Sequence, residues 1–305
     1  MQIRIATRKS ELALWQARHV AEKLEALSTV TSVSLVPLST RGDEVLDQSL
    51  QKLGGKGLFI KELEVAMQAD QADIAVHSMK DVPAEMPQGF CIAAVLERAN
   101  PTDALVSASN AALDDLPAGA RIGSSSLRRQ AQLKARRPDI DVIPLRGNVN
   151  TRLAKLSDGQ YDAIVLASAG LERLGLEARI TEELPLEKML PAAAQGVIGI
   201  ECLDGRDDLL DTLALLEDPV SKLTTEAERA VAATLAADCQ SPLASYAVIE
   251  KNVLTIEALV ASADGGRLIR DSVAGRKSDA GALGVAVAER LVLQGARELL
   301  AGEAE

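Results

Sequence analysis

The chain has 305 residues, a formal net charge of −11 at pH 7, and 47% hydrophobic and 25% charged residues. These values are typical of a soluble globular protein with two or three domains. The acidic balance argues against general binding to nucleic acid or to a membrane surface, because both require a basic face. No run approaches the apolar length of a membrane-spanning helix.

Cysteine use and the N-terminal sequence indicate the compartment. The three cysteines, Cys91, Cys202 and Cys239, are odd in number and lack metal-ligand spacing, so we expect free thiols and no bound metal. Residues 1–6 predict a strand rather than the charged and apolar segment of an export signal. Both observations favour the reducing cytoplasm.

The first third of the chain alternates between predicted strands and helices. A strand at 3–7 leads into a helix at about 11–27, with Ser10 placed to cap it. Further strands are predicted at 32–38 and 74–76, separated by a glycine-rich loop and a helix at about 60–68. This alternation is typical of an α/β unit with a largely parallel sheet.

A weak internal echo predicts a second such unit. Residues 71–76 resemble residues 160–165, and each segment is a short apolar run of the kind that forms a buried strand.

The pattern changes after Pro219. A helix near 221–235, a hairpin centred on Asp264, Gly265 and Gly266, and a helix at about 280–300 predict a small α+β domain.

Arginines concentrate between residues 123 and 152. Gly-Ser-Ser-Ser-Leu-Arg-Arg stands at 123–129, and Leu-Arg-Gly-Asn-Val-Asn-Thr-Arg at 145–152. Spacing alone leaves two interpretations, an anionic ligand matched by guanidinium groups or a solvated basic helix face. Both segments follow predicted strands, where open α/β sheets bind ligands, as do Arg8 and Lys80. This placement favours the anion site, in a cleft between the two units.

Several of these residues also have a structural interpretation. Ser10 and Ser124–Ser126 are as well explained as helix caps. Lys56, between glycines, could bind phosphate, but the full P-loop pattern is absent. His19 is expected to pack on its helix, and His77, at a strand end, is more often structural than catalytic.

Asp81 and Cys239 are the residues most suited to chemistry. Asp81 would face a cleft rich in cations, where its carboxylate could steady a developing positive charge, move a proton, or merely balance the arginines. Cys239 lies in a turn-like segment, where a thiol can act as a nucleophile or a covalent anchor, the alternative being an inert buried thiol. Inert burial is the expected state of Cys91 and Cys202.

Together these motifs resemble the porphobilinogen deaminase (hydroxymethylbilane synthase) family. The resemblance spans nearly the whole chain in collinear order. Its motifs are Ile-Ala-Thr-Arg-Lys-Ser at 5–10, Thr-Arg-Gly-Asp at 40–43, Gly-Gly-Lys-Gly-Leu-Phe at 54–59, His-Ser-Met-Lys-Asp-Val-Pro at 77–83, Ser-Ser-Leu-Arg-Arg-Gln at 125–130, and the segment 145–152. The chain departs from the family at Ala237-Asp238, before the anchoring cysteine, at Ala194, and at Thr102, where arginine is common.

The resemblance implies two periplasmic-binding-protein-like α/β domains and a small C-terminal α+β domain. Domain 1 would comprise residues 1–98 and 191–217, domain 2 residues 99–190, and domain 3 residues 218–305. It further implies a dipyrromethane cofactor joined to Cys239 by a thioether. On it the enzyme condenses four porphobilinogen molecules head to tail, releases ammonia at each step, and liberates hydroxymethylbilane. We expect a cytoplasmic monomer.

The resemblance also assigns roles to individual residues. Asp81 corresponds to the catalytic aspartate, which stabilises positive charge on a pyrrole. Cofactor binding falls to Cys239, Lys80, Ser124, Ser125, Ser126, Arg128, Arg129 and Arg146. Substrate binding falls to Arg8, Ser10, Arg146, Arg152, Arg173, Lys56 and Gln195, of which the arginines and Ser10 would bind the acetate and propionate groups.

A rival hypothesis is a non-catalytic two-lobed protein that binds small anions. It predicts an export signal and has no use for Asp81 or Cys239. A cysteine hydrolase would need a histidine near Cys239, and neither His19 nor His77 is an obvious partner.

Overall fold

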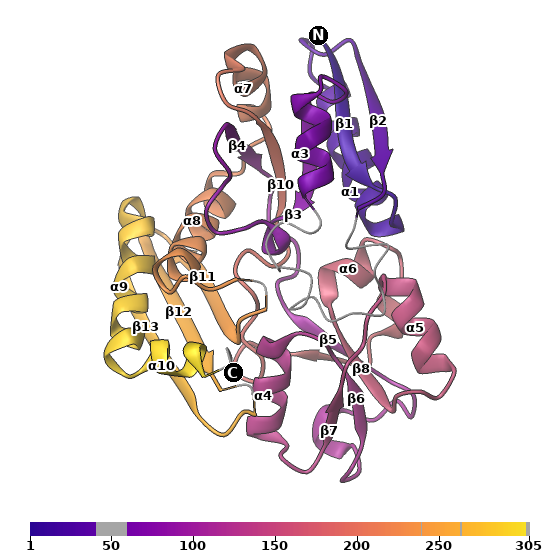
Figure 1. The fold of residues 1–305 in the computed structure, drawn as a ribbon, viewed down its shortest axis with the longest axis vertical. Coiled ribbons are helices and arrows are strands. Elements are labelled where there is room, and N and C mark those ends of the chain that lie inside the picture. The colour runs from indigo at the N-terminus through magenta and orange to yellow at the C-terminus, as the bar shows by residue number, and fades with distance from the viewer. Residues whose placement is uncertain (41–59, 239, 263, 303–305) are drawn as a thin grey trace. The chain divides into compact units, whose positions relative to one another are not determined.

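The computed structural model describes residues 1–40, 60–238, 240–262 and 264–302 (Figure 1). They form two compact units, one of Met1–Ala99 with Val197–Lys222, the other of Asn100–Gly196 with Leu223–Glu305. The chain therefore leaves the first unit and returns to it. The finer three-domain boundaries stay a prediction.

The first unit contains a five-stranded sheet of order β2-β1-β3-β10-β4. Its strands are β1 (Gln2–Arg8), β2 (Ser32–Leu38), β3 (Ile74–Ser78), β4 (Phe90–Val95) and β10 (Ile198–Leu203). β1 runs parallel to β2 and β3, whereas β10 is antiparallel to both of its neighbours. The sheet is thus mixed rather than largely parallel, because β10 enters after the long excursion through the second unit.

Alternation of side chains along β1 and β3 places a helix on each face of this sheet. Ile3 and Ile5 pack with Val20 of α1 (Glu11–Glu25), and α7 (Asp207–Ala214) joins the same core. Ala6 packs with Leu63 of α3 (Lys61–Gln68) on the opposite face.

The second unit repeats this plan in a sheet of order β7-β6-β8-β5-β9. Its strands are β5 (Asp103–Ser107), β6 (Arg121–Gly123), β7 (Asp141–Ile143), β8 (Ala163–Ala167) and β9 (Glu182–Leu184). β6 pairs in parallel with β7 and β8, and β5 is antiparallel to its two neighbours. Leu133 of α4 (Leu127–Arg136) and Leu153 of α5 (Val149–Ser157) belong to separate cores on its two faces. The short α6 (Ser168–Glu172) follows β8.

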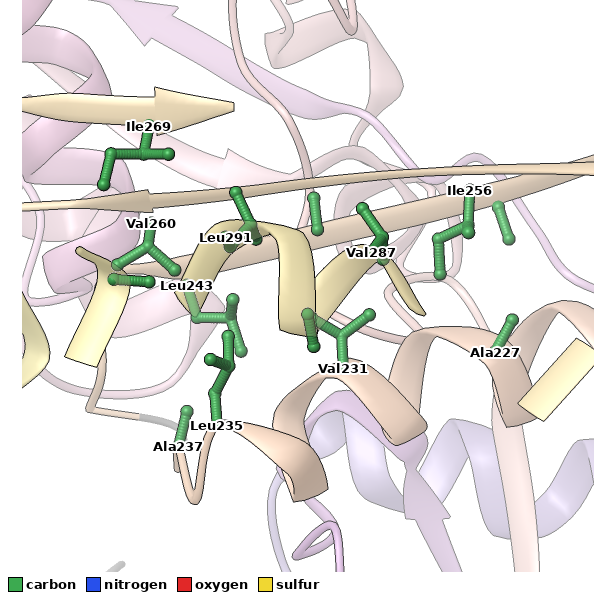
Figure 2. Packing of buried hydrophobic residues seen from close by; sticks show 14 of the residues in the cluster. Ala227, Val231, Leu235, Ala237, Leu243, Ile256, Val260, Ile269, Val287 and Leu291 are labelled. Carbon is green, nitrogen blue, oxygen red and sulfur yellow. The ribbon is translucent and has the colours of Figure 1, made fainter. Parts of the chain in front are cut away.

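The C-terminal part is an antiparallel sheet of β11 (Leu243–Glu250), β12 (Val253–Ala261) and β13 (Leu268–Arg276). Helices α8 (Pro219–Thr234) and α9 (Ala280–Leu293) pack on one face, where Val231, Ile256 and Leu291 share a core (Figure 2). A third helix, α10 (Ala296–Ala301), follows Gly295, whose φ of 94° ends the helix expected to run unbroken to residue 300.

This arrangement confirms the predicted fold class of two α/β domains and a small C-terminal α+β domain. Among the described helices, none has the length and apolarity needed to cross a membrane.

Candidate active site

A pocket in the first unit lies where β1 and β3 end. The strands' last residues, Arg8 and Ser78, line it. The other lining residues come from α1 and its N-cap, from the N-cap of α3, from β3 and from the turn after β3, and they are Ser10, Leu12, Ala13, Gln16, Ile60, Val76, His77 and Asp81. The carboxyl ends of parallel strands are the usual ligand position in α/β sheets.

Ser10 has the capping role expected of it. It precedes α1 in an extended conformation, and its hydroxyl accepts a hydrogen bond from the Ala13 N–H at 3.4 Å. The Thr7 hydroxyl donates to the Ala13 carbonyl at 3.1 Å and further fixes the turn between β1 and α1. Capping does not remove Ser10 from the pocket, so the structural and ligand roles coexist at this residue.

Asp81 and Lys80 lie on a 3-10 turn, Met79–Asp81, that follows β3 directly. The Met79 N–H donates to the Val197 carbonyl at 3.0 Å, and the Met79 side chain is buried. Gly199 accommodates this side chain, because a Cβ there would lie 2.0 Å from the Met79 sulfur. Asp81 itself is exposed at the pocket, so a buried anchor presents an accessible carboxylate.

Two side-chain pairs stiffen the pocket wall. Gln16 donates to the Ser78 hydroxyl at 2.8 Å. The Nε2 atom of His77 lies 2.7 Å from Oε2 of Glu201, a fully buried residue of β10. Burial raises the pKa of nearby Glu64, with a further contribution from the Glu201 charge.

In the second unit, two arginines share one buried carboxylate. Asp103 accepts hydrogen bonds from Arg128 Nη1 at 2.7 Å and from Arg129 Nε and Nη2 at 3.0 and 2.7 Å. All three side chains are less than a tenth exposed. Burial alone would raise the pKa of Asp103, but the two guanidinium charges outweigh it and hold that pKa well below its usual range.

Polar groups gather where β6 and β7 end. The Ser125 hydroxyl donates to the Leu145 carbonyl and accepts from the Leu145 N–H, both at 3.0 Å, and so joins the two segments. Ser126 occupies the N-cap position of α4, but its side chain makes no capping bond. The prediction that a serine side chain caps this helix is therefore wrong for Ser126, which has the N-cap position but not the hydrogen bond. Ser124 is buried, and its hydroxyl accepts from the Ser126 N–H at 3.3 Å.

The two arginines of the second motif flank a glycine turn. Arg146 follows β7 by three residues and is half-buried. Arg152, on α5, donates from Nε to the Gly147 carbonyl at 2.7 Å. The Asn148 side chain caps α5 by accepting from the Thr151 N–H at 2.9 Å. The local fold thus places Arg146 and Arg152 on either side of the start of one helix.

Gln195 lies next to a crossing between the units in sequence, and Arg173 contacts Gly196 at the same point. Arg173 donates to the Gly196 carbonyl at 2.7 Å, and burial lowers its pKa to about 10. Nε2 of Gln195 lies within hydrogen-bond distance of the Pro101 and Thr102 carbonyls and of Asp103 Oδ1, at 2.8, 3.2 and 3.0 Å. The amide nitrogen of Gln195 is thus committed to this segment. Whether Gln195 also binds substrate stays a prediction.

Lys56 and Cys239 lie outside the described residues, so their roles stay predictions. Next to Cys239, the Asp238 carboxylate accepts from the Gln240 N–H at 2.9 Å and from the Ser241 hydroxyl at 3.2 Å. This departure from the family pattern therefore supplies an acceptor to Gln240 and Ser241.

Sequence reasoning missed Asp103 and Gln16 and gave Glu201 no role. Each is a buried polar residue among apolar neighbours: Gln16 lies on the inner face of α1, and Glu201 in the apolar strand β10. A polar residue at a buried position of an amphipathic pattern was the available signal.

Comparison with known proteins identifies the family. Residues 3–211 match the model described as "Porphobilinogen deaminase, dipyromethane cofactor binding domain", and residues 222–292 match its C-terminal domain. The chain belongs to the porphobilinogen deaminase family. It is a transferase of tetrapyrrole biosynthesis, and residues 3–211 correspond to the dipyrromethane cofactor binding domain.

Full-length relatives agree with this assignment. The chain is 54% identical over 299 residues to the porphobilinogen deaminase of Xanthomonas axonopodis pv. citri, with 98% of each chain covered. It is 51% identical over 296 residues to the porphobilinogen deaminase of Thiobacillus denitrificans, with 97% of each covered. The resemblance seen in the motifs is confirmed.

Similar solved structures include the VFT2 domain of Bordetella pertussis BvgS, with a TM-score of 0.42 at 15% identity over 70% of this chain and 84% of that chain. Another is the aliphatic sulphonate binding protein SsuA of Escherichia coli, with a TM-score of 0.42 at 13% identity over 76% of this chain and 70% of that one. Likenesses at this level carry no conclusion about function.

Proposed function

We propose that the chain condenses four porphobilinogen molecules head to tail into hydroxymethylbilane, releasing ammonia at each step. The observation that carries the proposal is the pocket of the first unit, which brings Arg8, Ser10 and Asp81 together at the ends of β1 and β3. These residues supply a cation, a hydroxyl and a carboxylate. A cationic group binds the substrate's carboxylates, and an anionic group stabilises charge on its ring.

The donors of the second unit fit a carboxylate-bearing cofactor. Arg128 and Arg129 together bring two positive charges, and Asp103 brings one negative charge. The cluster of these three side chains therefore keeps an excess positive charge, which an anion would balance. Near it in the sequence, the unused N-cap of α4 and Arg146 add further donors for anions. The donor set therefore matches acetate and propionate groups.

The residues proposed to hold dipyrromethane are Cys239, through a thioether, and Lys80, Ser124, Ser125, Ser126, Arg128, Arg129 and Arg146. When bound, this group supplies the primer on which the new chain is built. The fixed positions of Arg128 and Arg129 mean that these side chains need no ordering when the ligand arrives, which lowers the entropic cost of binding.

Substrate binding is assigned to Arg8, Ser10, Arg146, Arg152, Arg173, Lys56 and Gln195. Loss of ammonia from porphobilinogen leaves positive charge on its pyrrole. Asp81 lines the pocket on a turn anchored by Met79, so its carboxylate is preorganised to stabilise that charge. We further propose that the enzyme is a monomer and acts in the cytoplasm.

The test is the rate of hydroxymethylbilane formation from porphobilinogen by the Asp81→Asn variant. Removing the carboxylate's charge should lower kcat by about 10²–10³-fold, the usual effect of losing one preorganised electrostatic group. Asp81 is exposed, so the melting temperature should stay within the small range of surface substitutions.

The matched control is Glu85→Gln, which removes an exposed carboxylate close in sequence that does not line the pocket. It should keep wild-type turnover. Wild-type turnover by Asp81→Asn would reject the role of Asp81, and a wild-type protein without turnover would reject the function itself.

A further inference from the structure

The imidazole of His77 belongs to the pocket that contains Asp81, although its place at a strand end favoured a structural role. We propose that His77 accepts the ring proton released when porphobilinogen units are joined, and that Glu201 positions the imidazole for this transfer. The proposal rests on the proposed condensation reaction and adds to it a residue that handles protons.

The geometry is that of a base held by a carboxylate. His77 lines the pocket yet is only 7% exposed. Its Nε2 atom lies 2.7 Å from Oε2 of Glu201, on the neighbouring strand of the same sheet. No partner for Nδ1 is found among the described residues, which leaves this nitrogen for exchange with the pocket. A nucleophile or base oriented by a third group is a recurrent catalytic arrangement.

The buried position of Glu201 makes it a strong orienting group. Its side chain is fully buried, and its second oxygen, Oε1, has no hydrogen-bond partner among the described residues. A buried carboxylate that lacks other partners interacts strongly with the one group that contacts it, because little water screens the pair. Positive charge arriving on His77 would therefore be stabilised by Glu201.

The remaining polar groups of the pocket are poor proton acceptors. The guanidinium of Arg8 offers donors and no acceptor, the serine hydroxyls and the Gln16 amide are weak bases, and Asp81 is assigned to charge stabilisation. Histidine is the side chain that both takes and gives a proton near pH 7. The charged groups around its ring are Glu201 of β10, Glu64 of α3, Arg8 of β1 and Asp81 of the following turn.

A C–C bond forms between the aminomethyl carbon of porphobilinogen and the free α-carbon of an acceptor pyrrole. The C–N bond to the ammonium group breaks and ammonia leaves. The acceptor's α-C–H bond then breaks, its electron pair restores the pyrrole, and its proton passes to Nδ1 of His77 and on to water.

The experiment compares His77→Gln, Glu201→Gln and the double variant as purified holoenzymes, with cofactor loading checked by intact mass. Each single variant should lower kcat by at least about tenfold with little change in KM, since general base catalysis contributes about 10²–10⁴-fold. The double variant should be no slower than His77→Gln, because Glu201 acts through His77. In His77→Gln the fall in rate at acid pH should disappear.

His19→Gln is the matched control. It removes the other of the two histidines in the sequence. The His19 ring stacks on Trp15 with 5.1 Å between the ring centroids, and His19 does not line the pocket. Wild-type kcat and an unchanged pH profile in loaded His77→Gln would overturn the proposal. A wild-type protein that forms no hydroxymethylbilane from porphobilinogen would instead reject the proposed function.

A second readout is independent of turnover and of variant folding. Imidazole NMR signals of the wild-type protein, assigned with His19→Gln, should shift for His77 when porphobilinogen is added, because His77 lines the pocket. The His19 signals should stay unchanged. His77 signals that do not respond to substrate would overturn the proposal, because a base must contact the pocket.

Discussion

At the scale of single residues, buried carboxylates hold the polar groups of both units. Asp103 fixes Arg128 and Arg129, and Glu201 fixes His77. In each case the partner is a group that the family resemblance or the pocket geometry assigns to ligand chemistry. Breaking a buried pair leaves a charge without compensation, so these carboxylates should matter for stability as much as for activity.

The clearest stability prediction concerns Asp103→Asn. Loss of the carboxylate leaves two buried guanidinium groups without a counter-charge, which should lower the free energy of unfolding by about 3–5 kcal/mol at pH 7. Urea denaturation measures this change. The exposed Asp162→Asn, which removes the partner of Arg121, is the control and should cost about 1 kcal/mol or less.

The same variant has a defined pH dependence. Because the pKa of Asp103 is lowered in the folded state, its contribution is fully present above its unfolded pKa of about 3.9 and is lost as pH falls further. The difference between wild type and Asp103→Asn should therefore stay constant from neutral pH to about pH 5 and shrink below about pH 4. A difference that grew on acidification would contradict the pairing.

Two of the three cysteines lie in an environment that disfavours the thiolate. Sγ of Cys91 and of Cys202 lie 3.7 Å apart on adjacent strands. Burial, with a further contribution from Cys202, raises the pKa of Cys91 to about 12. Few thiolates form at such a site, so these cysteines suit the inert role expected from sequence and leave Cys239 as the candidate anchor.

At the scale of helices and strands, local patterns predicted much of the structure. The strand at 32–38 has the predicted bounds, because its apolar pattern is a local signal. The direction of β10 could not be predicted this way, since strand pairing after a long excursion depends on tertiary contacts. The missed β11 contains Ala244, Ser245 and Ala247, which have weak strand propensity and are held by burial.

The contact of α8 with α9 yields a prediction about Gly284. A Cβ built there would lie 2.1 Å from the Ala227 carbonyl oxygen, so Gly284→Ala forces the helices apart. Overpacking of this kind costs about 1–3 kcal/mol of unfolding free energy, measurable by thermal or urea denaturation.

Gly281→Ala in the same helix is the control. Its added Cβ would meet only the end of the flexible Glu226 side chain, at 2.8 Å. Since alanine favours helix by up to about 1 kcal/mol over glycine, this variant should be neutral or more stable. Equal destabilisation by both variants would show that helix contact is not the cause.

At the scale of the whole molecule, the sequence motifs predicted which distant residues share a pocket better than they predicted the contacts of individual side chains. Arg8, Ser10 and Asp81, far apart in the chain, were predicted to share a ligand site and do line one pocket. The pairing of Arg128 and Arg129 with Asp103 was not predictable, because it depends on how α4 lies against β5. The same limit applies to His77, whose partner is 124 residues away in the chain.

The most direct test of the proposed function is the intact mass of the purified protein. The wild type should be heavier than its 32.2 kDa chain by one dipyrromethane, and Cys239→Ser should have the mass of the bare variant chain. Addition of porphobilinogen should extend the wild-type adduct by whole pyrrole units. A wild-type mass equal to that of the bare chain, and unchanged by porphobilinogen, would contradict a covalent primer at Cys239.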